Sequence, residues 1–169
     1  QHALLVEFDT VHGRWAGKIA TGDETLVIND HAMAFTQSDT IKDLPLAAMG
    51  VDLVLECTGV FKTEALVEPY YAAGVKKVIV SAPVKDTGAL NLVYGVNHQI
   101  YDATQHDLIT AASCTTNCIA PVVNVLQEEI GIKHGSITTI HDVTNTQTIV
   151  DKGHKDARRA RSALNSLVP

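Results

Sequence analysis

The sequence predicts an α/β fold built around a parallel sheet. Residues 51–83 read as a buried strand, a helix and a second buried strand, which is the order of a βαβ unit. Both strands are continuous apolar runs, which is typical of parallel strands that are covered on both faces. With 169 residues, 46% of them hydrophobic, the chain can form the core of one domain, or of one domain and part of another.

The first 37 residues favour an antiparallel arrangement instead. Short β-like runs alternate with turns here, namely "HALLVEF", "GKIAT", "TLVIND" and "AMAFTQ". Their spacing predicts a meander of hairpins. The opening "QHALLVEFDT" has neither a Met nor a basic segment before an apolar one, so we expect no signal peptide and interpret the chain as a fragment.

The βαβ unit offers small polar residues where each strand ends. "VDLVLECTG" ends in Thr58-Gly59, "KTEALVEPYYAAG" predicts a helix closed by Gly74, and "VKKVIVSAP" ends in residues 81–83. Ligands of parallel sheets bind beyond the carboxyl ends of the strands, so a cofactor can approach the backbone there, although an ordinary loop explains the same residues. The chain contains no GxGxxG motif, with which a doubly wound nucleotide domain normally opens.

The remaining chain predicts further strands around one helix. "LNLVYGVN", "DLITAAS" and "SITTIHDVTN" are strand-like, and "CTTNCIAPVVNVLQEEIG" has the caps, apolar positions and final glycine of a helix. Pro121 cannot donate a backbone N–H, so we expect it within the first turn of that helix. Residues 146–169 are polar and irregular, with a short helical finish.

Cys114 stands at the expected junction of strand and helix. Unpaired backbone N–H groups and the helix dipole stabilise an anion there, which lowers the pKa of a thiol and favours a nucleophile. Cys118 is one turn further on and lacks that advantage, so we expect it to be a small buried hydrophobe. From position alone, the packing interpretation stays open for Cys114 too.

The cysteines and histidines could form a metal site, or a histidine could serve as a catalytic base. Cys114 and Cys118 with His134 and His141 fit no common zinc spacing, so no metal is expected. A reactive thiol needs a base, and among the eight histidines His141 is the best candidate because it ends an apolar strand-like run. Spacing alone does not choose among the histidines.

Composition narrows the range of partners. A formal charge of −6 argues against nucleic acid as the main partner, although "HKDARRAR" is locally basic. Polar residues and Pro interrupt the longest uncharged stretches, so no membrane span is expected. Three cysteines in a chain that needs no disulfide for stability favour the reducing cytoplasm.

Several motifs together resemble one enzyme family. "SCTTNCIAPVVNVL" resembles the active-site signature of the phosphorylating glyceraldehyde-3-phosphate dehydrogenases, and further landmarks of that family occur in the same order, namely "FDTVHGRW", "ECTGVF", "VIVSAP" and "YGVNH". The resemblance covers essentially the whole chain. It implies an incomplete Rossmann-like dinucleotide-binding domain at residues 1–112, followed at residues 113–169 by the start of an α+β catalytic domain that includes an S-shaped loop.

The resemblance implies an activity and its catalytic pair. The family oxidises glyceraldehyde 3-phosphate with NAD through a cysteine thiohemiacetal and thioester, and inorganic phosphate then releases 1,3-bisphosphoglycerate. Cys114 matches the nucleophile, and His141 matches the base that activates the thiol and assists hydride departure. The preference for NAD or NADP stays open, because the acidic residue with which the family contacts the ribose has no counterpart in this chain.

The resemblance also implies ligand contacts. Ser113 and Thr115 match the site of the attacking phosphate, and Thr144 matches a residue that holds the phosphate of the substrate. Ser81 matches a cofactor contact, as does the turn of Thr58 and Gly59. Three arginines match groups that contact a neighbouring subunit or lie near a phosphate in the homotetramer typical of the family: Arg158, Arg159 and Arg161.

Two departures from the family pattern widen the range of expected functions. The glycine-rich turn that precedes the family's other landmarks and the family's C-terminal half have no counterpart here, so we expect the 169-residue chain alone to be inactive. Asp142 and Val143 follow His141, where a small and an aromatic residue are more usual; Asp142 either raises the pKa of the imidazole or points to solvent. This variant resembles a bacterial branch associated with arsenate as acyl acceptor. Erythrose-4-phosphate dehydrogenation and a non-catalytic binding or assembly role are the alternatives.

Overall fold

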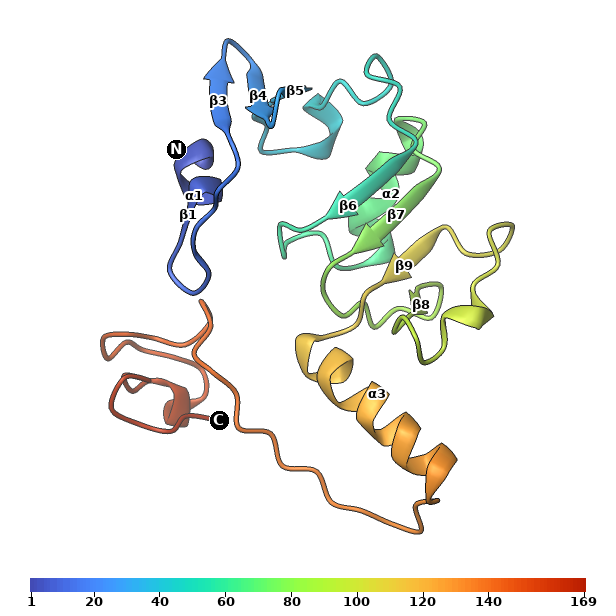
Figure 1. The fold of residues 1–169 in the computed structure, drawn as a ribbon, viewed down its shortest axis with the longest axis vertical. Helices are drawn as coiled ribbons and strands as arrows, with labels where there is room; N and C mark the ends of the chain where they lie inside the picture. The colour runs from blue at the N-terminus through green and yellow to red at the C-terminus, as the bar shows by residue number, and fades with distance from the viewer. The chain divides into compact units, whose positions relative to one another are not determined.

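The computed structural model describes residues 1–169, which divide into two compact units, Gln1–Pro121 and Val122–Pro169. Each unit is described by itself (Figure 1). The helices and strands are, in chain order, α1 (His2–Glu7), β1 (Phe8–Asp9), β2 (Gly13–Arg14), β3 (Ile19–Gly22), β4 (Thr25–Ile28), β5 (His31–Ala34), β6 (Leu53–Glu56), α2 (Glu64–Ala72), β7 (Lys77–Val80), β8 (Leu90–Asn91), β9 (Leu108–Thr110) and α3 (Cys114–Glu129). Short 3-10 turns lie at Ile41–Asp43, His98–Ile100 and Ala157–Arg159. None of the helices is both long and apolar enough to cross a bilayer.

The predicted antiparallel meander is confirmed for β3, β4 and β5, which form one sheet in that order. The β4–β5 turn consists of Asn29 and Asp30, both with positive φ, as a tight two-residue hairpin requires. The strand predicted at "HALLVEF" was wrong, because residues 2–7 form α1. A short apolar run of Ala, Leu and Val has no period that separates helix from strand, so its local pattern was ambiguous.

The predicted βαβ unit is confirmed and lies at the centre of the first unit. A four-stranded parallel sheet has the order β6-β7-β9-β8, and α2 joins β6 to β7 across one face of it (Figure 1). The Thr63 side chain accepts the Leu66 N–H to begin α2, and Gly74 at φ +93° follows its end. The core beneath α2 includes the fully buried Val67 and Val78. The chain is therefore α/β with a parallel sheet, as its apolar runs predicted.

Two other predicted strands differ in the structure: one is shorter than predicted, and one does not form. Of "LNLVYGVN", only Leu90–Asn91 pairs as β8. "SITTIHDVTN" forms no strand, and its Ile140 is 90% exposed. A strand needs a neighbouring strand to satisfy its backbone groups, and this stretch belongs to none of the three sheets.

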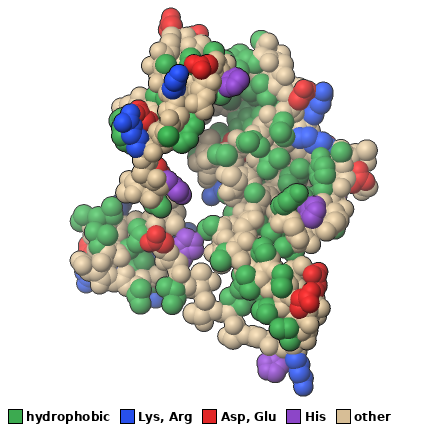
Figure 2. Space-filling view, viewed as in Figure 1, with side chains coloured by type: hydrophobic (Ala, Val, Ile, Leu, Met, Phe, Trp, Pro, Cys, Tyr) green, Lys and Arg blue, Asp and Glu red, His purple; other side chains and the backbone are tan.

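Helix α3 runs from the first unit into the second. It contains Pro121 well inside its length, so the prediction that Pro121 lies in the first turn was wrong. Proline removes one N–H bond, and the turns on both sides continue the helix to Glu129. None of the residues of α3 is buried, and its apolar side chains lie on the surface (Figure 2).

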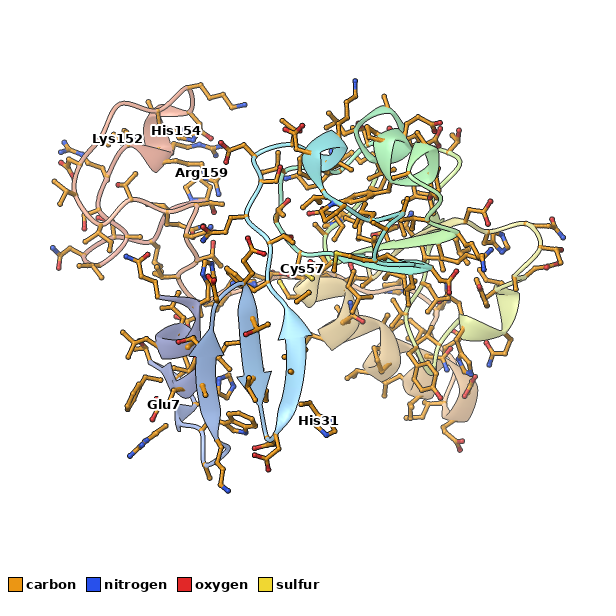
Figure 3. All side chains as sticks on the ribbon, turned by 90° about the horizontal axis from the view of Figure 1, so that it is seen from above. Glu7, His31, Cys57, Lys152, His154 and Arg159 are labelled. Atoms are coloured by element: carbon orange, nitrogen blue, oxygen red, sulfur yellow. The ribbon has the colours of Figure 1, made fainter.

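In the second unit, a loop closes around the 3-10 turn Ala157–Arg159. Its closing backbone bonds run from Lys152 N to Ala160 O, 3.0 Å, and from Ala163 N to Thr148 O, 2.9 Å. The Asp156 carboxylate accepts from Arg158, which lowers the pKa of Asp156 to about 2. Lys152, His154 and Arg159 come from this one loop (Figure 3). Of the predicted helical finish, only this 3-10 turn forms.

Candidate active site

The site is centred on the elbow between β9 and α3. After Thr110, the chain turns through Ala112, which has a left-handed φ of +56° and is 8% exposed, and enters α3 at Cys114. The Ser113 hydroxyl accepts the Thr116 N–H at 3.0 Å and lies 2.8 Å from the Thr116 hydroxyl. Ser113 therefore caps the helix, because its oxygen satisfies an N–H that has no partner within the helix.

Cys114 is the first residue of α3 and is exposed. At this position the positive end of the helix dipole and the first N–H groups favour a thiolate over a thiol. The prediction of a nucleophile at a helix entrance thus has the geometry it needs. Thr115 follows it in the first turn and is half-buried.

Cys118, predicted to be buried, is exposed. The prediction was wrong because it assumed a core beneath α3, and no residue of that helix is buried. None of the three cysteines forms a disulfide. Position in the helix therefore separates Cys114 from Cys118, whereas burial does not.

A hollow lies beside the elbow. Its lining residues are Pro83, Asn91, Val93, Val96, Asn97, Ala112, Ser113, Thr116 and Ala120. They come from the chain after β7, from β8 and the turn after it, and from the start of α3. The parallel sheet thus brings three separate segments to the place where the helix begins.

The turn after β6 carries Thr58 and Gly59. Gly59 has φ +72°, and a Cβ added there would meet nothing within 4 Å, so its backbone faces open space. The Thr58 hydroxyl and N–H both donate to one oxygen of Glu56, and the Thr58 hydroxyl accepts the Val60 N–H at 3.1 Å. Glu56 therefore fixes the turn through Thr58, and the backbone at Gly59 stays accessible to a ligand.

Glu56 and Tyr70 support this turn and were missed by sequence reasoning. The Glu56 side chain is 2% exposed, and its second oxygen accepts the Tyr70 hydroxyl at 2.7 Å. Burial, reinforced by this hydrogen bond to Glu56, raises the pKa of Tyr70. An acidic residue within an otherwise apolar strand was the signal that could have found the pair.

Ser81 lies at the corresponding end of β7. Its N–H donates to the Glu56 carbonyl at 2.9 Å, which joins the ends of β6 and β7, and its side chain is exposed. Cys57, which directly follows β6, is exposed at the same edge (Figure 3). Thr58, Gly59 and Ser81 thus lie at the carboxyl edge of one sheet, where ligands of such sheets bind.

His141 and Thr144 lie in the second unit, outside any helix or strand. The His141 Nδ1 is 2.8 Å from the Asp142 carbonyl oxygen, and the Asp142 carboxylate accepts the Val143 N–H at 2.8 Å. The Thr144 hydroxyl donates to Gln147 Oε1 at 2.7 Å. The structure gathers Ser113, Cys114 and Thr115 on one elbow, whereas it describes His141 and Thr144 only within their own unit.

Two family models match separate parts of the chain. Residues 1–64 match the model of the NAD binding domain of glyceraldehyde 3-phosphate dehydrogenase, and residues 113–169 match the model of its C-terminal domain. The parallel α/β sheet of the first unit fits the NAD-binding class that the first of these models names. The chain belongs to the glyceraldehyde-3-phosphate dehydrogenase family.

Individual relatives extend the likeness along nearly the whole chain. Glyceraldehyde-3-phosphate dehydrogenase 3 of Nostoc sp. is 54% identical over 167 residues, which are 99% of this chain and 49% of the relative. The Pseudomonas aeruginosa enzyme is 44% identical over 168 residues, 99% of this chain and 50% of the relative. Glyceraldehyde-3-phosphate dehydrogenase 1 of Bacillus cereus is 42% identical, with 99% and 50% covered. The chain spans about half the length of these relatives.

Proposed function

We propose that the intact protein is a phosphorylating glyceraldehyde-3-phosphate dehydrogenase that uses NAD. The observation that carries this proposal is the exposed thiol of Cys114 at the first residue of α3, directly after the capping Ser113, in a stretch that matches the family's C-terminal domain model. In this proposal residues 1–112 belong to the cofactor domain and residues 113–169 begin the catalytic domain. The protein acts in the cytoplasm as a homotetramer.

The carboxyl edge of the sheet fits a dinucleotide. Small residues end β6 and β7, and the open backbone at Gly59 lets a flat ring or ribose approach closely. Thr58 and Ser81 supply hydroxyl groups at this edge. NAD, when bound, supplies the hydride acceptor.

The chemistry assigned to the chain's own residues starts at Cys114. His141 takes the Cys114 thiol proton, and the thiolate adds to the aldehyde carbon, forming a C–S bond; the carbonyl oxygen then receives that proton from His141, which gives a thiohemiacetal. His141 takes the hydroxyl proton as a hydride leaves the same carbon, which gives a thioester. Inorganic phosphate near Ser113 and Thr115 then attacks the thioester carbon, the C–S bond breaks, and the Cys114 thiolate is restored. Thr144 holds the phosphate of the substrate.

Helix geometry supports the anion sites in this scheme. The N-terminus of α3 presents N–H groups and a positive dipole end, which stabilise both a thiolate and an incoming phosphate. Thr115 lies in that first turn, beside Cys114. The same groups stabilise negative charge on oxygen as the thiohemiacetal and the phosphate adduct form.

The test is NAD reduction by the intact protein with glyceraldehyde 3-phosphate and inorganic phosphate. We expect Cys114→Ser to lower the rate roughly 10³-fold or more, because the thiolate nucleophile is lost. Cys118→Ser is the matched control and keeps the parental rate. Parental activity in Cys114→Ser contradicts the assignment.

Assays with other acyl acceptors and another aldose phosphate distinguish the possible substrates. Turnover that continues without phosphate points to a hydrolytic reaction on erythrose 4-phosphate, and turnover restored by arsenate alone points to the arsenate-using variant. No turnover with any of these, in a folded protein that binds NAD, favours a binding or assembly role.

A further inference from the structure

The elbow that carries Cys114 contains a conformation that alanine rarely adopts. Ala112 has φ +56°, and the left-handed conformation is unfavourable for a residue with a Cβ because the Cβ comes too close to the following carbonyl oxygen. A glycine would avoid that cost, yet the position holds alanine and is 8% exposed. The surrounding contacts must therefore hold the backbone here.

Thr110 supplies the first of these contacts. Its side chain is fully buried, and its hydroxyl donates to the Ala82 carbonyl at 2.7 Å while accepting the Ala112 N–H at 3.0 Å. Both hydrogen-bonding functions of the hydroxyl are thus used. Thr110 ties the elbow to the chain after β7, the segment that begins with Ser81.

Asn117 supplies the second contact from within α3. Its side-chain amide donates to the Ala111 carbonyl at 2.7 Å and to the Ser113 carbonyl at 2.9 Å. These two carbonyls flank Ala112 on either side. Asn117 therefore holds the peptide group that precedes Ala112 and the peptide group that precedes Cys114, so it restrains the backbone on both sides of the left-handed residue.

The backbone of β9 completes the support. Ala111 N donates to the Val80 carbonyl at 2.9 Å, and Leu92 N donates to the Thr110 carbonyl at 3.0 Å. The strand leading to the elbow is therefore anchored on both sides. The chain leaves the sheet at Ala112, and the side chains of Thr110 and Asn117 hold the backbone there.

We propose that Thr110 and Asn117 are positioning residues for Cys114. By holding Ala112 left-handed, they place Cys114 at the first residue of α3, where the helix terminus stabilises its thiolate. The inference rests on the proposed function in taking Cys114 as the nucleophile. Neither residue contacts substrate in this proposal; both act through the backbone of the elbow.

The test measures the reactivity of Cys114 in the intact protein, in the absence of substrate and cofactor. Alkylation by iodoacetamide is followed across pH by mass spectrometry in a Cys118→Ser background, with Cys57 as internal reference. We expect Thr110→Val to slow alkylation of Cys114 by about threefold or more at neutral pH and to move its pH profile upward. Cys57 should react at the parental rate.

Two further variants separate positioning from simple loss of packing. Thr110→Ser retains the hydroxyl and should restore the parental profile, and Thr87→Val makes the same change at an exposed position and should have no effect. If Thr110→Val does not fold, Asn117→Leu decides, because this exposed residue then loses both N–H donations at a similar size and gains no charge near Cys114. We expect the same slowing of Cys114 alkylation.

The proposal and the proposed function fail in different ways. Less than about threefold change in a folded Thr110→Val protein, or in Asn117→Leu where that variant decides, overturns the positioning role. Absence of NAD reduction by the parental protein overturns the enzyme assignment whatever the alkylation rates. A parental protein that is active, with unchanged alkylation in the variant, overturns the positioning role alone.

Discussion

The elbow that carries Cys114 is held by hydrogen bonds to buried strands, whereas the segment that carries His141 has neither helix nor strand. Before Cys114, Thr110 is fully buried and Ala112 nearly so. Beside His141, Ile140 is 90% exposed and Val143 is 49% exposed. The position of Cys114 is therefore set by contacts within residues 1–121, whereas His141 lies in the second unit in a segment without helix or strand.

This difference matters because the proposed chemistry needs both groups. A general base acts only within hydrogen-bond reach of the proton that it takes. The N-terminus of α3 favours a thiolate at Cys114, whereas the base proposed at His141 acts only where its ring reaches the reacting proton. The comparison leads to four predictions, from the largest expected effect to the smallest.

Replacing His141 tests whether its segment takes part in catalysis. We expect His141→Asn to lower kcat/KM of the intact protein about 10²–10⁴-fold, the usual contribution of a general base. His134→Asn changes an exposed histidine of the same region and should keep parental activity. Steady-state rates of NAD reduction measure both. A His141→Asn protein with parental kcat/KM would show that this histidine is not the base.

Two apolar truncations compare the stability that each region contributes. Val78→Ala should lower the free energy of unfolding by about 2–3 kcal/mol, because Val78 is fully buried under α2. Ile140→Ala should change it by less than about 0.5 kcal/mol, because that side chain is exposed. Urea unfolding followed by circular dichroism gives both values. A large loss in Ile140→Ala would mean that the His141 segment packs in solution.

Tyr71 should make the first unit sensitive to alkali. Burial, with Asp107 as the next cause, raises the pKa of Tyr71 from 10.0 to about 12, so the folded state keeps the phenol neutral. The resulting stability is complete below pH 10, the unfolded pKa, and is lost as the pH rises to about 12. Urea unfolding should therefore show a decline across this window.

Tyr71→Phe is the matched variant. It should reduce the decline above about pH 10, since no phenol remains to ionise. At neutral pH it should be at least as stable as the parent, because the Tyr71 hydroxyl is buried without a hydrogen-bond partner. An unchanged alkaline decline would assign the effect to another group.

The smallest effect is expected at the surface ion pair of the second unit. Arg161 lies 2.5 Å from the Asp151 carboxylate, and the two side chains are 72% and 52% exposed. Its hydrogen bond lowers the pKa of Asp151. Exposed pairs contribute little at physiological ionic strength, so Arg161→Ala should leave the unfolding midpoint unchanged. A clear shift in that midpoint would show that the loop is held by this pair.

The sequence predicted well where a local pattern and the tertiary contacts agree. The apolar runs of β6 and β7, with the helix closed by Gly74, matched the structure because each signal lies within a few residues. It failed at α1, where a short apolar run suited either element, and at Cys118, where burial depends on what covers α3. The predicted roles of all the site residues, Cys114 and His141 included, stay predictions.

The sequence by itself determined that a strand would lead into a helix at Cys114, because the Ser cap and the apolar periodicity are local properties. Only the tertiary structure decided the left-handed Ala112, the Thr110 bond to Ala82 and the Glu56 bond to Tyr70. The two hydrogen bonds join residues that are 28 and 14 positions apart in the chain. The physical reason is that such residues become neighbours only when β9 pairs with β7 and when α2 packs on the sheet.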